Sequence, residues 1–260
     1  MNQADKQRAQ AMQGTLLHEQ AGKQRIESIQ ETLLHEMKRG AYRYAERLPR
    51  ESALAQRLGI SRTQLRDSLA ELEREGFITR RHGVGTVINR HVLSVPVRAD
   101  LEAEFMEMVV QSGFAPEERL LAARRVPAGK AEAARLGIAA GEEALFVSRL
   151  VTANGRPAVY CEDYIPCSLI RDFSYTDADL QAPIFDFLAR FCSVEPYMDL
   201  TELRAVPARG EAARALGVAL GEPLLYMDEV DYDMGGRPVL YAPQYFADGI
   251  IRHTVMRKKF

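Results

Sequence analysis

Long hydrophobic runs are absent from this 260-residue sequence, and its first residues contain no apolar stretch. No run reaches the roughly 18–20 residues that a membrane-spanning helix needs, and nothing near the N-terminus predicts a signal peptide. Cysteine is scarce. The three cysteines are Cys161, Cys167 and Cys192, and no two of them form a CxxC pair. That odd number favours a reduced, cytoplasmic compartment over a disulfide framework. A structural metal at Cys161 and Cys167 is the alternative, but further ligands at usable spacing are missing, so we expect no metal and no cofactor.

Catalytic signatures are also missing. The sequence contains no GxSxG, HExxH or P-loop pattern, and its Ser, Cys and His residues form no recognisable nucleophile arrangement. Residues 92–260 contain one histidine, His253, which we expect at the surface rather than in a catalytic role. We therefore predict no catalytic residue and do not expect an enzyme.

The net charge of −2 does not indicate a nucleic-acid binder until it is divided along the chain. Residues 23–91 contain 14 Lys or Arg against 9 Asp or Glu, whereas residues 92–260 contain 18 against 25. Residues 1–22 balance, with 2 of each sign. Basic charge is thus concentrated in residues 23–91, as expected of a phosphate-facing module joined to an acidic second domain.

Apolar periodicity in this basic region predicts three helices. The first is Gln24–Arg39, where apolar residues recur at three- and four-residue steps and form one stripe. The second is Glu51–Leu58, ended by Gly59, which suits a left-handed turn. The third is Arg62–Glu75, preceded by Ser61 as a favourable N-cap. Two short helices joined by a Gly-containing turn are typical of a helix-turn-helix.

The start of the third predicted helix is rich in hydrogen-bond donors. Arg62 and Arg66 lie one helical turn apart, with Thr63 and Gln64 beside them. Recognition helices present their N-terminal residues to base edges, where arginine can bind guanine O6 and N7. The free N–H groups of the same helix end, next to Ser61, favour a phosphate. The alternative is that both arginines only form a solvated helix face.

A β-hairpin is predicted for residues 77–89. Its tip contains Gly83 and Gly85, which permit a tight turn that can approach a sugar-phosphate backbone closely. Arg80, Arg81 and His82 supply donors around this tip. A lone histidine is usually structural, but in this Gly-flanked, Arg-rich setting we predict that His82 contacts the minor groove or a phosphate.

The segment RLPRESALAQRLGISRTQLRDSLAELEREGFITRRHGVGTVI resembles the winged helix-turn-helix of GntR-family transcription regulators, within a domain expected at residues 23–91. The resemblance implies that the third helix and the wing contact DNA. The matching residues are Arg62, Thr63, Arg66, His82, Gly83, Gly85 and Thr86. The family often has an arginine after the Glu of its Leu-Pro-x-Glu motif, but Ser52 stands there in this chain. Arg50, two residues earlier, is the remaining candidate for a DNA contact from the second helix.

The second domain, expected at residues 101–260 after a linker at Val92–Asp100, contains an internal repeat. VPAGKAEAARLGIAAGEEAL at 126–145 and VPARGEAARALGVALGEPLL at 206–225 are identical at 10 of 20 positions. An NGRP turn at 154–157 and a GGRP turn at 235–238 continue the likeness, each followed by a predicted strand. Two units of helix, strand, turn and strand indicate one antiparallel sheet in an α+β fold, with helices over one face or at the ends.

This region resembles the UTRA effector domain of the HutC subfamily, over about residues 92–255. The matching pieces are the LG…GE…L segment, the NGRP turn and TyrIlePro at 164–166. The resemblance implies a chorismate-lyase-like fold that binds a small molecule and thereby modulates DNA affinity. Two alternatives stay open: a chorismate-lyase-like enzyme fused to a DNA-binding module, and an architectural DNA binder without a ligand. The size of the domain, which is enough to enclose a pocket, favours the sensor.

The resemblance also indicates effector contacts from Arg149, Glu162, Tyr164, Leu240 and Phe246. Arg149 stands where sugar-phosphate-sensing relatives have a phosphate-binding arginine, and Glu162 and Tyr164 alternate onto one strand face. Where those relatives have a second arginine and a carboxylate, this chain has Val151 and Leu240. These losses predict a less polar effector with one anionic group, such as a carboxylate, rather than a phosphosugar. Arg149 could instead pair with a carboxylate of the protein, and Tyr164 could belong to the core.

Helix-turn-helix proteins usually bind as two-fold dimers, because one helix in one groove reads too few bases. We expect a homodimer, formed mainly through the second domain, on a palindromic double-stranded operator. Repression relieved by the effector is the expected sign of regulation. Residues 1–22 are Gln-rich, and we predict a mobile or helical extension there.

Overall fold

The computed structural model describes residues 28–101 and 103–259. Within these residues the chain forms two compact units that divide between Val95 and Pro96, inside the predicted linker. Residues from Met256 onward belong with the first unit. The predicted extension at residues 1–22 and the start of the first predicted helix lie outside the described residues.

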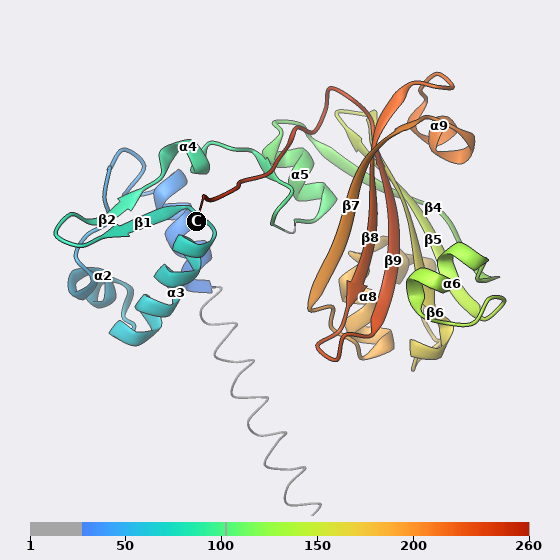
Figure 1. Cartoon of the computed structure of the whole chain (residues 1–260), viewed down its shortest axis with the longest axis horizontal. Coiled ribbons are helices and arrows are strands. Elements are labelled where there is room, and N and C mark those ends of the chain that lie inside the picture. The colour runs from blue at the N-terminus through green and yellow to red at the C-terminus, as the bar shows by residue number, and fades with distance from the viewer. Residues whose placement is uncertain (1–27, 102, 260) are drawn as a thin grey trace, which may run out of the picture. The chain divides into compact units, whose positions relative to one another are not determined.

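The first unit is a winged helix-turn-helix (Figure 1). Residues 28–38 are helical, and α2 (Glu51–Leu58) and α3 (Arg62–Arg74) follow. The wing pairs β1 (Ile78–Arg81) with β2 (Gly85–Ile88) in antiparallel register. Apolar side chains from all three helices are buried and form the core: Leu33, Met37, Leu54, Leu65, Leu69 and Leu72.

The predicted linker is partly regular. The short helix α4 (Arg90–Leu93) begins with an arginine that anchors it, since Arg90 Nη1 donates to the Met37 carbonyl at 2.6 Å. In the second unit, β3 (Val97–Arg98) pairs in parallel with β10 (His253–Thr254). The chain therefore passes from the first unit to the second between α4 and β3, and both of these segments are held by hydrogen bonds.

The C-terminal residues correct the predicted domain bounds, which placed all of residues 101–260 in the second domain. Lys258 Nζ donates to the backbone carbonyls of Glu73 and, at 2.9 Å, Arg74. These carbonyls lie in the last turn of α3, where helical N–H partners are missing and an ammonium group is favourable. The tail from Met256 therefore belongs to the first unit.

Antiparallel pairing joins six strands of the second unit into one sheet, in the order β4-β5-β6-β9-β8-β7. One half consists of β4 (Pro116–Pro127), β5 (Glu143–Ala153) and β6 (Arg156–Pro166). The other half consists of β7 (Met198–Pro207), β8 (Pro223–Tyr232) and β9 (Pro238–Phe246). The halves meet at β6 and β9. They correspond to the internal repeat, but each copy begins with a strand, β4 or β7, that the repeat did not predict.

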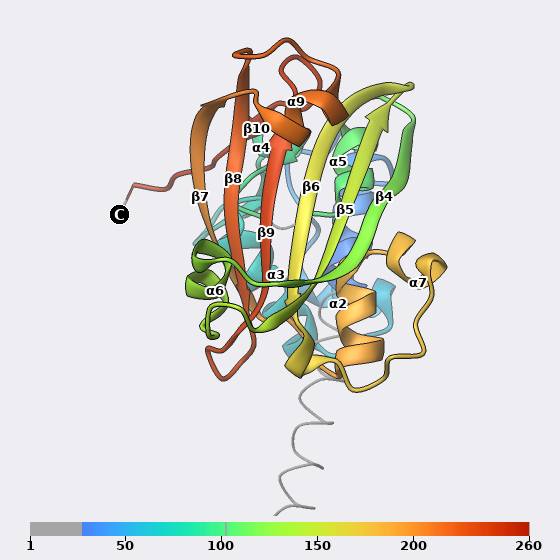
Figure 2. The same cartoon turned by 90° about the vertical axis from the view of Figure 1, so that its right-hand side faces the viewer.

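Helices cover both faces of this sheet, which corrects the expectation of helices over one face or at the ends. On one face, α6 (Lys130–Leu136) packs against β9 and α9 (Gly210–Leu216) packs against β6 (Figure 2). On the other face lie α5 (Phe105–Gln111), α7 (Asp177–Gln181) and α8 (Ile184–Phe187). The helices α5, α7 and α8 come from segments before β4 and between β6 and β7, and these segments lie outside the repeat.

The three cysteine side chains are free thiols. Cys161 and Cys192 are buried and Cys167 is half-buried, and none forms a disulfide. Burial raises the pKa of Cys192 to about 11, so this thiol stays protonated near neutral pH.

In the described part of the chain, no three His, Cys, Asp or Glu side chains are placed to hold a metal. Across the same residues, no helix is long and apolar enough to span a bilayer.

Candidate nucleic-acid interface and ligand cavity

The start of α3 is closed by a capping box. Ser61 Oγ accepts a hydrogen bond from the Gln64 backbone N–H at 3.1 Å, and Gln64 Oε1 accepts one from the Ser61 N–H at 3.0 Å. The exchange satisfies N–H groups that the first turn of a helix leaves open. Ser61 is thus the N-cap that the sequence predicted. The Ser61 and Gln64 side chains therefore hold the helix start in place. Because they bond to the backbone, they have fewer free hydrogen-bonding groups for DNA than predicted.

Three predicted DNA-contacting side chains are exposed at this helix start: Arg62, Thr63 and Arg66. The Arg62 side chain makes no hydrogen bond or ion pair with any residue that the structure describes. Arg66 Nε donates to Glu51 Oε2 at 2.7 Å, which links α3 to α2. Because the Arg66 side chain is 58% exposed, this pair contributes little to stability, and the arginine can exchange it for a base or a phosphate.

The wing has a glycine-bent tip. Gly83 has a φ of 75° and Gly85 a φ of 96°, both in the region that other residues rarely adopt. A Cβ added to either glycine would meet nothing within 4 Å, so the backbone conformation, and not crowding, requires glycine there. Arg81 and His82 are exposed beside these glycines. The tip therefore offers two donor side chains and accessible backbone.

Two arginines fix the wing within the first unit, Arg47 and Arg80, of which Arg80 was predicted as a donor around the wing tip. Arg47 Nη1 donates to the Val84 carbonyl at 3.1 Å. Arg80 donates to the Glu73 carboxylate of α3 from its backbone N–H at 2.6 Å and from Nε at 2.7 Å. Burial alone would raise the pKa of Glu73, but the hydrogen bonds and the charge of Arg80 lower it. The wing is thus attached to α3 near the end of that helix.

The remaining predicted DNA contacts differ in exposure. Arg50 is exposed at the N-cap position of α2, where its side chain makes no capping hydrogen bond. Thr86 is half-buried, and its carbonyl accepts a hydrogen bond from the Leu48 N–H at 2.9 Å. The predicted residues therefore lie at three places: the start of α3, the wing, and the residue before α2.

Strand alternation divides the predicted effector residues between the two faces of the sheet. Arg149 pairs with Cys161 across β5 and β6, so it lies on the face covered by α7 and α8. Glu162 and Tyr164 lie on the opposite face, which α6 and α9 cover. Leu240 lies on the Arg149 face. No single cavity therefore contains all of the predicted residues.

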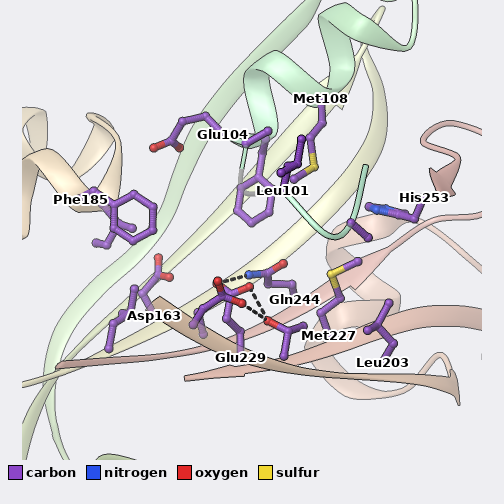
Figure 3. A pocket seen from close by; sticks show the side chains of 18 of the residues that line it. Leu101, Glu104, Met108, Asp163, Phe185, Leu203, Met227, Glu229, Gln244 and His253 are labelled. Carbon is purple, nitrogen blue, oxygen red and sulfur yellow. Dashed lines mark hydrogen bonds between the residues drawn. The ribbon is translucent and has the colours of Figure 1, made fainter. Parts of the chain in front are cut away.

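A cavity of about 290 Å³ lies on the Arg149 face (Figure 3). Arg149 and Leu240 line it, together with polar side chains of the sheet: Asp163, Asp199, Thr201, Glu229 and Gln244. Apolar side chains form much of the rest: Leu101, Phe105, Met108, Ile184, Phe185, Leu203 and Met227. Phe246 is not among the lining residues, but its ring packs against Phe105 at 6.1 Å and His253 at 4.5 Å, which both line the cavity.

Arg149 is paired with two carboxylates. Its Nη2 donates to Asp163 Oδ2 at 2.7 Å and its Nη1 to Glu118 Oε1 at 3.0 Å, and the residue is 2% exposed. Burial opposes the charged form, but Asp163 and the other neighbouring groups raise the pKa of Arg149 above its ordinary value. Of the two possibilities left open for Arg149, pairing within the protein is the one found. The predicted anionic effector therefore lacks the free cation on which that prediction depended.

Two carboxylates share one hydroxyl on the floor of the cavity. Thr201 Oγ1 lies 2.8 Å from Asp199 Oδ2 and 3.1 Å from Glu229 Oε2. Gln244 Nε2 donates to Glu229 Oε1 at 2.8 Å (Figure 3). A hydroxyl has a single proton and can donate to only one carboxylate at a time. Thr201 therefore connects the carboxylates of two neighbouring strands.

Glu162 and Tyr164 line a second cavity, of about 560 Å³, on the opposite face. The hydroxyls of Tyr160 and Tyr164 donate to the Glu162 carboxylate at 2.8 and 3.3 Å. Burial and the charge of Glu162 raise the pKa of both tyrosines, so both stay neutral donors. The Tyr164 ring also stacks on Tyr241 at 5.8 Å, so the alternative that it belongs to the packed aromatic layer describes part of its role.

Several cavity residues were not predicted. Thr201 stands opposite Glu229 across β7 and β8, and Asp199 lies on the same face. Their signal in the sequence is a polar residue at alternate positions of β7, but β7 was not among the predicted strands. His253, predicted at the surface, has both ring nitrogens buried and lines the cavity from β10.

Comparison with known proteins gives the family. Residues 25–88 match the bacterial regulatory proteins of the gntR family, and residues 111–248 match the UTRA domain. The transcriptional repressor NagR of Bacillus subtilis is 26% identical over 199 residues, covering 76% of this chain and 80% of NagR.

Solved structures share the fold. The possible transcriptional regulator YydK of Bacillus subtilis aligns with a TM-score of 0.73 at 18% identity, over 90% of this chain and 99% of YydK. The ligand-binding domain of a GntR-family regulator from Bordetella bronchiseptica aligns with a TM-score of 0.51 at 28% identity, over 55% of this chain and 92% of that domain. A gntR-type helix-turn-helix followed by a UTRA sheet domain means that this chain belongs to the GntR family of transcriptional regulators, in its UTRA-containing HutC type.

Proposed function

We propose that this DNA-binding regulator is a repressor whose operator affinity changes when a small molecule occupies the 290 Å³ cavity. One observation carries the proposal. The cavity is lined by Ala99, Asp100 and Leu101, which follow β3, and by His253 of β10. These paired strands stand next to the two points where the chain passes between its units. A ligand that contacts them acts directly on both connections to the DNA-binding unit.

The proposed regulation is a coupling of two binding equilibria. A ligand that fits the cavity in only one arrangement of the connecting segments favours that arrangement, and with it one spacing of the DNA-binding units. Couplings between sites in proteins are typically ~1–3 kcal/mol, or a change of about 5- to 150-fold in affinity. The name of NagR describes a repressor, which supports repression as the sign here.

A homodimer in the cytoplasm, bound to a palindromic operator, completes the proposal. Two helix-turn-helix units are needed to read two half-sites about one helical turn apart. The edge strand β7 supports assembly through the second unit, because Met198 and Leu200 are 52% and 63% exposed. Apolar side chains on an unpaired strand edge favour contact with another chain.

The enzyme alternative has less support. The 290 Å³ cavity contains no Ser–His or Cys–His pair in hydrogen-bond contact among the described residues. Its histidine, His253, makes no hydrogen bond to the described residues through either ring nitrogen. A general base needs to lie within hydrogen-bond reach of the group that it activates.

The test uses the full chain and DNA. Genomic fragments that the protein retains identify the operator, and fluorescence anisotropy then measures its affinity. We expect operator binding at least about 10³-fold tighter than binding to random DNA. Compounds that raise the unfolding temperature of the protein should also change its operator affinity, by about 5- to 150-fold. Ligand binding without any change in operator affinity would contradict the proposal, and turnover of the ligand would favour the enzyme.

A further inference from the structure

The two edges of the six-stranded sheet differ in regularity. At one edge, β4 has a register shift between Leu120 and Ala122 and exposes three arginines: Arg119, Arg124 and Arg125. Bulges and charged side chains are features that keep a strand edge from pairing with another chain. At the other edge, β7 pairs with β8 without a register shift, and Figure 2 shows it at the outer side of the sheet. β7 therefore lacks the bulge that disrupts β4.

The backbone groups of β7 that point to the open edge can be identified from two prolines. Pro207 stands opposite Pro223 in the register of β7 and β8. Because proline has no N–H, this pair is not a hydrogen-bonded pair of the ladder. Hydrogen-bonded and non-hydrogen-bonded pairs alternate along an antiparallel ladder, and among the described residues β8 is the only strand paired with β7. The residues whose N–H and C=O groups point to the open edge are therefore the odd-numbered ones: Asp199, Thr201, Leu203 and Ala205.

Both apolar and charged side chains are exposed along β7. Leu200 and Leu203 are 63% and 46% exposed, and the side chains of Glu202 and Arg204 are 60% and 49% exposed. The Glu202 carboxylate lies 3.8 Å from Arg204 Nε and 4.0 Å from an Arg135 nitrogen. Both distances are longer than a hydrogen bond, so the carboxylate can still accept hydrogen bonds from a closer cation.

We propose that β7 pairs with β7 of a second copy of this chain, in antiparallel register centred on Leu203. Of the two-fold registers, only this one places Glu202 opposite the partner's Arg204 and, by symmetry, Arg204 opposite the partner's Glu202. These are non-hydrogen-bonded pairs of the new ladder, in which opposite side chains lie closest. A register centred on Glu202 places two carboxylates opposite each other, and one centred on Arg204 places two guanidinium groups opposite each other. The proposal rests on the proposed function, since it specifies the interface of that homodimer.

The same register pairs the apolar side chains of the edge. Leu200 stands opposite the partner's Val206, and Leu203 stands opposite the partner's Leu203 on the two-fold axis. Leu203 belongs to a hydrogen-bonded pair of the new ladder, because its N–H and C=O groups are among those that point to the open edge. One surface patch thus binds its own copy, as the isologous interface of a two-fold dimer requires.

This interface brings the second copy to the 290 Å³ cavity. Asp199, Thr201 and Leu203 of β7 line that cavity. The partner's Leu203 lies on the same face as Leu203, since opposite residues of an antiparallel pair project to one side of the sheet. The partner therefore extends the cavity wall at β7, and the cavities of both copies lie on the same face of the joined sheet. The segment Ala99–Leu101, which leads from the DNA-binding unit, lines the same cavity, so both copies have this connection on that face.

Charge reversal in the full-length protein tests the register. Glu202→Arg places like charges opposite each other at both charge pairs, and so does Arg204→Glu. Each variant alone should have a dimer dissociation constant at least about tenfold above that of the wild type in analytical ultracentrifugation. An equimolar mixture should form a heterodimer, because opposite charges then face each other at both pairs, and an effect within one chain does not restore a dimer on mixing. Arg214→Glu is the control, since Arg214 is on α9 and its side chain is 75% exposed, and it should leave the dimer intact.

Cysteine crosslinking locates the two-fold axis without any change of charge. Leu203→Cys should form a disulfide between the two copies on mild oxidation, because the Cα atoms of a hydrogen-bonded antiparallel pair lie about 5.5 Å apart. Leu200→Cys should not form one, because the two copies of that residue are displaced along the strands by about 20 Å. The wild-type protein, with Cys161 and Cys192 buried and Cys167 half-buried, gives the background.

The proposal is overturned by a wild-type protein that is monomeric, by folded variants that stay monomeric when mixed, or by crosslinking of Leu200→Cys in place of Leu203→Cys. These experiments contain neither ligand nor DNA, so they separate this inference from the proposed function. A dimer formed through another surface, with operator affinity that changes when ligand binds, would refute the β7 interface and leave the regulation intact. A ligand without effect on operator affinity would refute the regulation and leave the interface intact.

Discussion

Among the predicted DNA contacts, we expect Arg62 to contribute most to reading the DNA sequence. Its side chain is exposed in the first turn of α3 and makes no hydrogen bond or ion pair with the described residues, whereas Arg66 pairs with Glu51 and Gln64 belongs to the capping box. An arginine free of intramolecular partners loses none of them when it contacts a guanine. Among the predicted contacts, Arg62 is therefore the one whose loss should most affect sequence preference.

We predict that Arg62→Ala weakens operator binding by ~1–3 kcal/mol and binding to random DNA by less, because a lost base contact affects only the specific complex. Anisotropy titrations with operator and random duplexes at one salt concentration measure both. Arg74→Ala is the control, since Arg74 lies at the other end of α3 and pairs with Glu71. Equal losses on the two duplexes would mean that Arg62 contacts only phosphate.

His253 links the cavity to pH. Burial lowers its pKa, so the folded protein binds a proton less readily than the unfolded chain, whose histidine titrates near about 6.5. Its contribution to stability is therefore present above that unfolded value and is lost as the pH falls from about 7 toward the lowered pKa.

The prediction is that His253→Gln reduces the loss of unfolding free energy between about pH 7 and pH 5, measured by urea denaturation. His91→Gln serves as the comparison, because His91 is exposed in α4. Wild-type and His253→Gln proteins with the same pH dependence would show that His253 is protonated equally in the folded and unfolded states.

The elements predicted from the sequence are those with local signals. Ser61 caps α3, Gly59 ends α2 at a φ of 66°, and Gly83 and Gly85 bend the wing, and each of these needs only neighbouring residues to recognise. The two edge strands β4 and β7 were missed, because their side chains alternate between half-buried and exposed over much of their length and contain no long apolar run.

The candidate cavity was the least predictable part for a related reason. Arg149 meets Asp163 and Glu118 only through the register of β4, β5 and β6. Glu162 and Tyr164 do share one strand face, as predicted, but the sequence of β6 does not say which helices cover that face. Knowledge of both helix layers is needed before any strand residue can be assigned to a cavity.

The edge strand β7 gives a prediction of its own. We expect Leu200→Lys to shift the protein from dimer to monomer in analytical ultracentrifugation, because it puts a charge on an exposed apolar edge. Operator affinity should fall with it, since two half-sites no longer bind together. Leu220→Lys changes a leucine that is 80% exposed in the turn before β8 and should leave the dimer intact. A Leu200→Lys protein that stays dimeric would place the interface elsewhere.

The molecule consists of two units, and the chain passes between them at two points. The first unit supplies the DNA-binding surface, and the second supplies the cavity. β3 and β10 pair with each other beside that cavity and lead to the residues where the chain crosses between units. This arrangement gives a ligand a physical route to influence DNA binding without any contact to DNA.

Thermodynamic linkage provides the most direct test of this account. If the cavity ligand changes operator affinity by some factor, the operator must change ligand affinity by the same factor. Calorimetric titration of the ligand into the full-length protein, with and without saturating operator duplex, measures this second factor. We predict a change of about 5- to 150-fold that equals the factor from DNA titrations. Ligand affinity that is the same with and without operator would show that cavity and DNA-binding surface are not coupled.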